Sequence, residues 1–248
     1  MRAFVLPSLV AVGLASLPTP VLAADLTEER VKEIVAEYIK ENPKTIFEAV
    51  SAYLVNEEQR TAQRAVEEAF ANPIPFTLQE GAPIRGDKNA PVQIIQIAEF
   101  ECPFCARAHD TLLELMRRYK SKVNVAFVHL PLSFHKEAIP AGAAAMAAHK
   151  QGKFWAYNDI LFANQDKLGE KLYTQTAGEL GLDMAKFNAD RKDPKVLAYI
   201  QEDAKRAGEI GARGTPYFLI NGVALNGAQP IEAFEAVVER HLADMAKK

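Results

Sequence analysis

The sequence predicts an α/β fold that carries a large helical insertion and follows an all-helical N-terminal segment. Apolar residues recur at helical spacing over residues 27–71. Short runs rich in β-branched residues stand at 91–100, 123–130 and 215–225. About 80 residues of helical character separate the second run from the third, so strands and helices mix as they do in α/β domains.

The first residues, MRAFVLPSLVAVGLASLPTPVLAAD, have the layout of a secretory signal peptide. One basic residue, Arg2, precedes an apolar run, and a small-residue site ends at Ala23 before a charged start at Asp25. A retained membrane anchor is the alternative, but the apolar run is shorter than the ~20 residues of a spanning helix. We therefore expect a signal peptide over residues 1–23 and an exported protein.

The composition excludes some partners. Hydrophobic residues make up 49% of the chain and charged residues 25%, as in ordinary globular proteins. The formal net charge is −3, and no basic stripe is present for a nucleic acid or an anionic membrane surface. We expect no nucleic-acid partner.

Residues 24–73 are predicted to form a helical oligomerisation segment. Thr27 suits the N-cap of a first helix and Pro43 the first turn of a second. Two such helices cannot enclose a core by themselves, so their apolar stripes must pack on the main domain or on another chain. Prolines and polar residues over 74–91 predict a linker. A linker favours self-association, as a dimer or trimer, through residues 25–71.

The main domain is predicted over residues 92–248. A buried strand leads into the sequence CPFC, a helix follows, and a second strand begins at Val123. The helical insertion is expected at about residues 132–212. Asn221-Gly222 then marks a hairpin turn, and an amphipathic helix closes the chain.

Cys102 and Cys105 are the only cysteines, and three interpretations compete for them. A structural disulfide would close a very short loop and add only about 2 kcal/mol, and secreted domains that need disulfides usually carry several. A zinc site needs further ligands, and His109, one helical turn after Cys105, leaves a site of both cysteines and this histidine open. The third interpretation is redox catalysis.

Redox catalysis accounts best for the position of the pair. A CxxC between a strand and a helix places the first sulfur at the helix N-terminus, where free N–H groups and the helix dipole favour a thiolate. Cys102 is therefore the expected nucleophile, and Cys105, shielded in the first turn, can displace a mixed disulfide. Pro103 fits the first helical turn. This chemistry needs no metal and no organic cofactor.

A companion motif, GARGTPYFLING, stands more than a hundred residues downstream. In thioredoxin-like folds a residue–proline bond in cis lies against the active-site disulfide, and the backbone before it pairs with the substrate chain. Thr215-Pro216 stands directly before a predicted strand and is placed for this role. An ordinary strand-initiating proline is the alternative.

The segments AEFECPFC and RGTPYFLINGV, with the long helical insertion between them, resemble the DsbA-type branch of the thioredoxin superfamily. VKEIVAEYIKENPKTIFEAVSAYL further resembles the N-terminal helices of the copper-sensitivity-suppressor (ScsC-like) branch. The resemblance implies a thioredoxin fold and a periplasmic thiol-disulfide oxidoreductase, an oxidase or an isomerase, whose N-terminal helices join protomers. It also implies cysteine-containing exported proteins as substrates and a membrane redox partner that resets the pair.

The resemblance assigns roles to individual residues. Cys102 is the attacking thiol, Cys105 the resolving thiol and Pro216 the cis-proline, while Thr215 is similar to the residue that isomerase-type members carry there. Pro103 and Phe104 form the dipeptide that tunes the pair. Since that dipeptide has no positive charge, we expect a reduction potential above that of thioredoxin but less extreme than the ~−120 mV of DsbA.

One position departs from the family pattern. Relatives usually have a buried glutamate six residues before the first cysteine, and this chain has Gln96, which cannot accept or donate a proton. Glu99 and Glu101 stand closer to the motif and are expected at the surface. Either Glu99 takes the place of that glutamate, acting through a water molecule, or proton transfer at the resolving thiol is slower in this chain. His135, at the start of the insertion, is expected to be structural.

Two other classes of protein stay open. The same fold could serve as a copper-binding or chaperone protein of the cell envelope, since a pair of thiols binds soft Cu(I). An envelope protein with an inert structural disulfide is the other. Copper titration and resistance to glutathione, respectively, would reveal them.

Overall fold

The computed structural model describes residues 27–247, apart from the side chains of residues 58, 59, 62 and 63. The predicted signal peptide, residues 1–23, lies outside the described residues. Contacts divide the chain between Arg60 and Thr61 into two compact units. Within residues 27–247, no helix combines the length and the apolar character that a membrane crossing requires.

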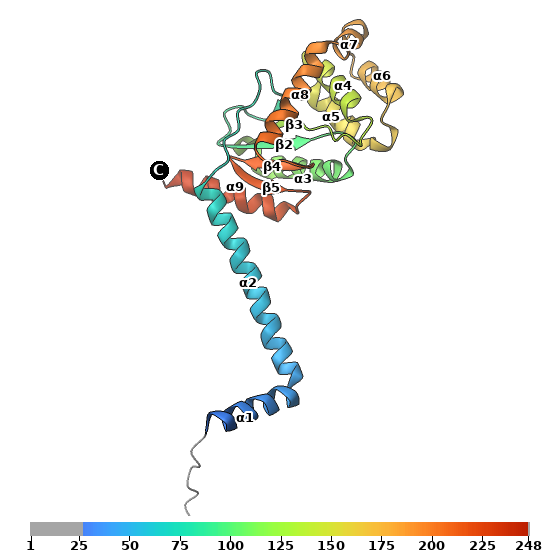
Figure 1. Ribbon diagram of the computed structural model, residues 1–248. Helices are drawn as coiled ribbons and strands as arrows, with labels where there is room; N and C mark the ends of the chain where they lie inside the picture. Colours follow the sequence, from blue (N-terminus) through green and yellow to red (C-terminus); the bar gives the residue numbers. More distant parts are fainter. Residues whose placement is uncertain (1–26, 248) are drawn as a thin grey trace, which may run out of the picture. The chain divides into compact units, whose positions relative to one another are not determined.

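Two helices, α1 (Glu28–Glu41) and α2 (Pro43–Ala71), form the N-terminal segment (Figure 1). Thr27 caps α1, since its hydroxyl accepts the Arg30 N–H at 3.3 Å. No residue of α1 is buried, and large apolar side chains on both helices are 43% to 72% exposed. They are Val31, Ile34, Val35, Tyr38 and Ile39 in α1, and Phe47, Val50, Tyr53, Leu54, Val55 and Val66 in α2.

The last turns of α2 pack on the main domain. The Arg240 guanidinium lies 4.1 Å from the centre of the Phe70 ring, and its Nη1 lies 2.6 Å from Oε1 of Glu67. A cation above an aromatic face is attracted by the ring. These contacts fix the end of α2, within the second unit, against the C-terminal helix.

A mixed five-stranded sheet in the order β1-β3-β2-β4-β5 is the centre of the main domain. β2 and β3 are parallel, while β4 runs antiparallel to both β2 and β5. The prediction of an α/β fold with a large helical insertion is therefore confirmed. The strands are β1 (Ile84–Arg85), β2 (Val92–Ala98), β3 (Val123–His129), β4 (Tyr217–Ile220) and β5 (Val223–Asn226).

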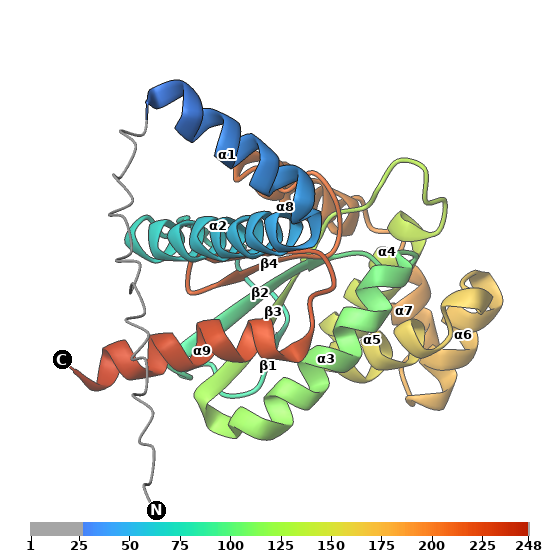
Figure 2. The same ribbon diagram turned by 90° about the horizontal axis from the view of Figure 1, so that it is seen from below.

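Helices cover both faces of the sheet. α3 (Pro103–Tyr119) and α9 (Ile231–Ala246) lie side by side on one face, as Figure 2 shows, and α8 (Pro194–Glu209) packs on the other. Helices α4 to α8 follow β3 and precede β4, so they form the insertion. The remaining helical elements are η1 (Lys120–Lys122), α4 (Ala138–Lys150), α5 (Phe154–Ala163), η2 (Gln165–Lys167), α6 (Glu170–Glu179) and α7 (Met184–Asp190).

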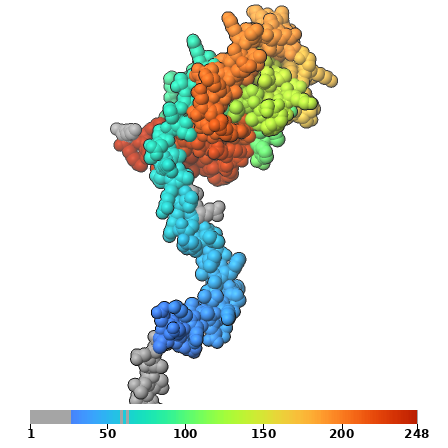
Figure 3. Space-filling model, in the orientation of Figure 1, coloured from blue at the N-terminus to red at the C-terminus, as the bar shows by residue number. Residues whose placement is uncertain are grey.

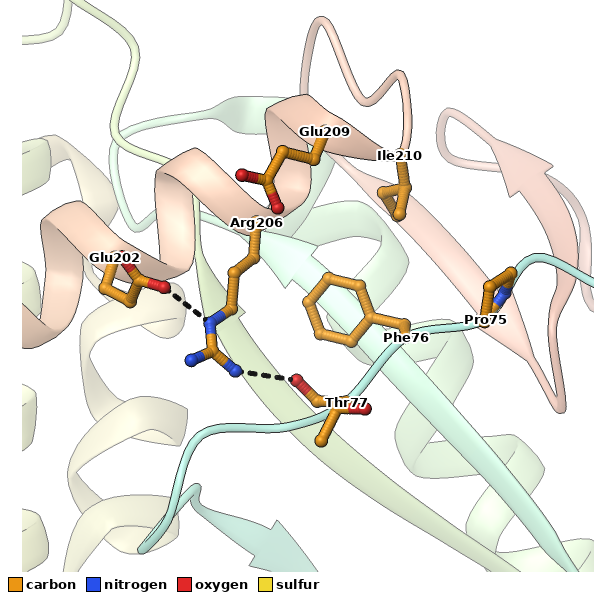
Figure 4. Close-up of a pocket in the computed structure, with 7 residues that line it drawn as sticks. All are labelled: Pro75, Phe76, Thr77, Glu202, Arg206, Glu209 and Ile210. Atoms are coloured by element: carbon orange, nitrogen blue, oxygen red, sulfur yellow. Dashed lines mark hydrogen bonds and ion pairs between the residues drawn. The ribbon is translucent and has the colours of Figure 1, made fainter.

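The prediction of a linker over residues 74–91 is wrong for most of this range, because the segment packs on the main domain. It contains β1, which pairs with β3, and Arg206 of α8 donates from Nη1 to the Thr77 carbonyl at 3.1 Å. Figure 3 shows the segment in blue-green against α8 in orange, and Figure 4 shows Phe76 beside Arg206. The prolines end α2, but the extended chain after them satisfies its backbone groups on neighbouring elements.

The hairpin between β4 and β5 meets the start of this segment. Asn221 and Gly222 have φ values of 46° and 90°, as the predicted tight turn requires. The Ile74 N–H donates to the Gly222 carbonyl at 2.8 Å. A Cβ atom on Gly222 would lie 2.7 Å from Cβ of Pro73, so this close approach requires glycine.

We expect Gly222→Ala to lower the free energy of unfolding by about 2–4 kcal/mol, because left-handed strain adds to the clash with Pro73. Gly227→Ala is the matched control, since Gly227 has a φ of 76° but no neighbouring atom nearer than 4.0 Å. The control should lose only the strain, about 1–2 kcal/mol. Urea unfolding measures both losses, and equal losses would show that Pro73 does not pack on the hairpin.

Candidate active site

The CPFC motif lies where β2 gives way to α3. Cys102 is the N-cap of α3, with φ −72° and ψ 116°, and Pro103 occupies the first helical position. The N–H groups of Cys105 and Ala106 donate to the Cys102 carbonyl at 3.0 and 3.3 Å. Cys102 is 3% exposed and Cys105 is fully buried. The first sulfur therefore lies at the helix N-terminus, as the motif predicts.

The Thr215–Pro216 peptide bond is cis, which confirms the sequence prediction. The Thr215 carbonyl faces the motif, because its oxygen lies 3.4 Å from the Cys102 Sγ although 113 residues of sequence separate the two. A pocket of about 390 Å³ opens beside this loop. Its lining residues are Gly211, Arg213, Gly214, Thr215, Pro216, Tyr217, Asn226 and Gly227.

The two thiols have opposite acidities. A hydrogen bond from the Cys105 thiol lowers the pKa of Cys102 to about 5, against the opposing effect of burial, with help from Thr215 and the N–H groups of Cys105 and Phe104. Burial raises the pKa of Cys105, and the neighbouring Cys102 raises it further. At neutral pH the site therefore holds one thiolate and one protonated thiol, as a nucleophile and a resolving group require.

Phe104 presents an exposed ring beside the cysteines, 53% accessible to solvent. The Arg107 guanidinium covers this ring at 5.0 Å from its centre. The dipeptide Pro103-Phe104 carries no charge of its own, so its tuning of the pair stays a prediction.

Gln96 and Glu99 are both buried. Gln96 is fully buried, and neither its Nε2 nor its Oε1 has a hydrogen-bond partner among the described residues. Glu99 is only 1% exposed, so the expectation of a surface residue is wrong. The chain turns inward before α3, and the carboxylate is satisfied there by the Glu101 N–H at 2.7 Å and by His135 Nδ1 at 2.5 Å.

Glu101 is also more enclosed than expected, being only partly exposed. Its Oε2 accepts the Glu137 N–H at 2.6 Å. This bond ties the turn before Cys102 to the start of α4.

One residue at the site escaped the sequence analysis. Gln165, in η2 of the insertion, donates from Nε2 to the carbonyls of Phe100 and Cys102 at 2.6 and 2.9 Å. Both carbonyls belong to the turn that carries the nucleophile, so Gln165 holds that turn in place. A glutamine more than sixty residues from the motif gives no signal of this contact in the sequence.

His109 is engaged away from the cysteines. Its Nε2 lies 2.9 Å from Oδ1 of Asp159, which also binds Arg85 at 2.6 Å. Within residues 27–247, no group of three His, Cys, Asp or Glu side chains is placed to hold a metal ion.

Comparison with known proteins identifies the family of the main domain. A family model described as Thioredoxin matches residues 78–240. The Na(+)/H(+) antiporter NhaA 3 of Salinispora tropica is 38% identical over 156 residues, which cover 62% of this chain and 24% of that protein. The chain thus spans about a quarter of the length of the curated relatives it matches.

Solved structures show the same fold. A thioredoxin-like oxidoreductase from Silicibacter pomeroyi has a TM-score of 0.61 at 26% identity, over 65% of this chain and 92% of its own. ScsC of Proteus mirabilis, in a transitional conformation, has a TM-score of 0.58 at 22% identity, over 88% of this chain and 97% of its own. The second likeness concerns the fold alone and extends beyond the residues that the family model matches.

We expect the stability of the reduced protein, relative to Cys102→Ser, to rise between about pH 5 and pH 8.5. The folded pKa of about 5 lies below the ~8.5 of an unfolded cysteine, so the unfolded chain binds more protons in this window. The contribution is complete above pH 8.5 and is lost as the pH falls through 5. Urea unfolding of both reduced proteins at several pH values measures it, and parallel curves would contradict the low pKa.

Proposed function

The chain belongs to the thioredoxin family, and from this premise we propose that it is an exported thiol-disulfide oxidoreductase acting through Cys102 and Cys105. The observation that carries the proposal is the asymmetry of the pair. The Cys102 sulfur has a pKa of about 5 and lies against the Thr215 carbonyl, while Cys105 is fully buried and protonated.

In the proposed reaction the Cys102 thiolate attacks one sulfur of a protein disulfide. A mixed disulfide forms and the other substrate sulfur leaves as a thiolate. Cys105 then attacks the Cys102 sulfur, which releases the second substrate thiolate and leaves the pair oxidised. The reverse sequence donates a disulfide to a substrate, so one site supports reduction, oxidation and, by both in turn, isomerisation.

The proposed substrates are cysteine-containing exported proteins, and a membrane redox partner would reset the pair in the periplasm. The predicted signal peptide supports export. The pocket of about 390 Å³ beside Thr215 and Pro216 supports capture of an extended chain, because the extended backbone before the proline can pair with an added strand.

We expect a reduction potential between about −270 and −120 mV, the values of thioredoxin and DsbA. The Cys102 pKa of about 5 supports this, because it lies between the ~7 of thioredoxin and the ~3.5 of DsbA. Equilibration of the protein with graded glutathione buffers, read by thiol alkylation and mass spectrometry, gives the potential. A value below about −300 mV would indicate an inert disulfide and end the enzyme proposal.

We also propose that copies of the chain associate, as a dimer or trimer, through residues 25–71. The support is the exposed apolar surface of α1 and α2 in residues 27–60, where Phe47 is 72% and Leu54 60% exposed. Contiguous apolar surface of this kind marks interaction sites. Joined protomers would enclose a misfolded substrate between several cysteine pairs, which favours isomerase activity over simple oxidation.

Combined Phe47→Glu and Leu54→Glu substitutions should reduce the particle to a single protomer, because charges in an apolar interface lose their hydration without a partner. Lys44→Glu is the control on the same helix, at a side chain 87% exposed, and should leave the assembly intact. Light scattering measures the mass in solution. An unchanged mass in the double variant would refute assembly through these helices.

A further inference from the structure

Glu99 is a buried carboxyl group beside both cysteines. Its backbone N–H hydrogen-bonds to Cys105, and its side chain is close enough to Cys102 for the two charges to interact. Buried carboxylates are rare unless they are paired or hydrogen-bonded. Its position three residues before the nucleophile therefore needs an explanation.

His135 connects this carboxylate to the surface. Its Nδ1 lies 2.5 Å from Oε1 of Glu99. The Glu99 side chain is 2% exposed, whereas the His135 side chain is 19% exposed. Because Nδ1 faces the carboxylate, Nε2 is the ring nitrogen that remains for exchange with water.

The resolving thiol needs such a connection. Cys105 must lose its proton before or while it attacks Cys102, yet burial holds it in the protonated form. Gln96 occupies the position where relatives carry an acid, and its amide cannot take the proton. Glu99 is a buried carboxyl group next to the cysteine pair.

We propose that Glu99 accepts the proton of Cys105 and that His135 exchanges it with solvent, an inference that rests on the disulfide exchange proposed above. As the Cys105 sulfur attacks the Cys102 sulfur, the thiol proton passes to the Glu99 carboxylate. The bond between Cys102 and the substrate sulfur breaks, and the electron pair leaves with the substrate thiolate. The Glu99–His135 pair then returns the proton to water, so that protons and electrons balance.

Other ionisable groups around Glu99 and His135 have partners of their own. Glu101 accepts the Glu137 N–H, and the Tyr173 hydroxyl of α6 donates to Glu137 at 2.7 Å. At the start of α3, Cys102 interacts with the Glu99 carboxyl group and Cys105 with its backbone N–H, while His109 faces Asp159. Burial raises the pKa of Glu99, and the Glu101 N–H and His135 lower it. Loss of His135 should therefore raise the pKa of Glu99 further and protonate it at a higher pH.

The test follows the resolving step alone. Reduced full-length protein reacts with glutathione disulfide, acid stops the reaction, and mass spectrometry follows decay of the mixed disulfide on Cys102 at several pH values. Glu99→Gln keeps an acceptor for the Glu101 N–H, yet it should slow the decay roughly 10²-fold at neutral pH, the usual effect of losing a general base. Its rate should then rise with hydroxide concentration. Asp110→Asn is the matched control, at an exposed carboxylate of α3, and should keep the pH profile of the unaltered chain.

His135→Gln separates proton transfer from a structural role. We expect its half-maximal rate to move to higher pH, while urea unfolding checks that the variant remains folded. A uniform loss at every pH would indicate only positioning and would overturn the relay. Decay in Glu99→Gln and His135→Gln like that in Asp110→Asn would overturn it too, with the proposed function intact. If the unaltered chain forms no mixed disulfide, the proposed function itself fails.

Discussion

The contact between the Cys102 sulfur and the Thr215 carbonyl is the constraint on which the active site depends. It joins segments 113 residues apart at 3.4 Å. The sheet makes it possible: β2 and β4 are antiparallel neighbours, and Ile97 pairs with Tyr217. The end of β2, from which the motif emerges, therefore meets the start of β4, which Thr215 and Pro216 precede. The backbone pairing of β2 and β4 therefore brings the two motifs together.

The helical insertion completes what the sheet begins. Gln165 binds the carbonyls of the motif turn, His135 binds Glu99, and Glu137 binds Glu101. Each of these bonds holds a residue between the end of β2 and the first turn of α3. The insertion is therefore part of the active site, because it supplies the polar partners that allow the turn before Cys102 to be buried.

The sequence predicted those parts of the site that depend on local chemistry. A CxxC after a strand indicates a thiol at a helix N-terminus, and a Thr-Pro before a strand indicates a loop that can face it. The burial of Glu99 and the role of Gln165 could not be predicted, because both depend on how distant helices pack over one turn. Prolines after α2 predicted a linker for a related reason: they exclude a helix but do not exclude an extended chain that binds a neighbouring surface.

The unequal acidity of the two thiols also bears on damage by oxidants. A thiolate such as Cys102 is the form that peroxides oxidise, first to a sulfenic acid. Cys105 is fully buried and hydrogen-bonds to Cys102, so it can condense with that sulfenic acid to a disulfide before irreversible sulfinic acid forms. Oxidative attack on Cys102 would then yield the oxidised form that the proposed reaction cycle already uses. The resolving cysteine protects the attacking one.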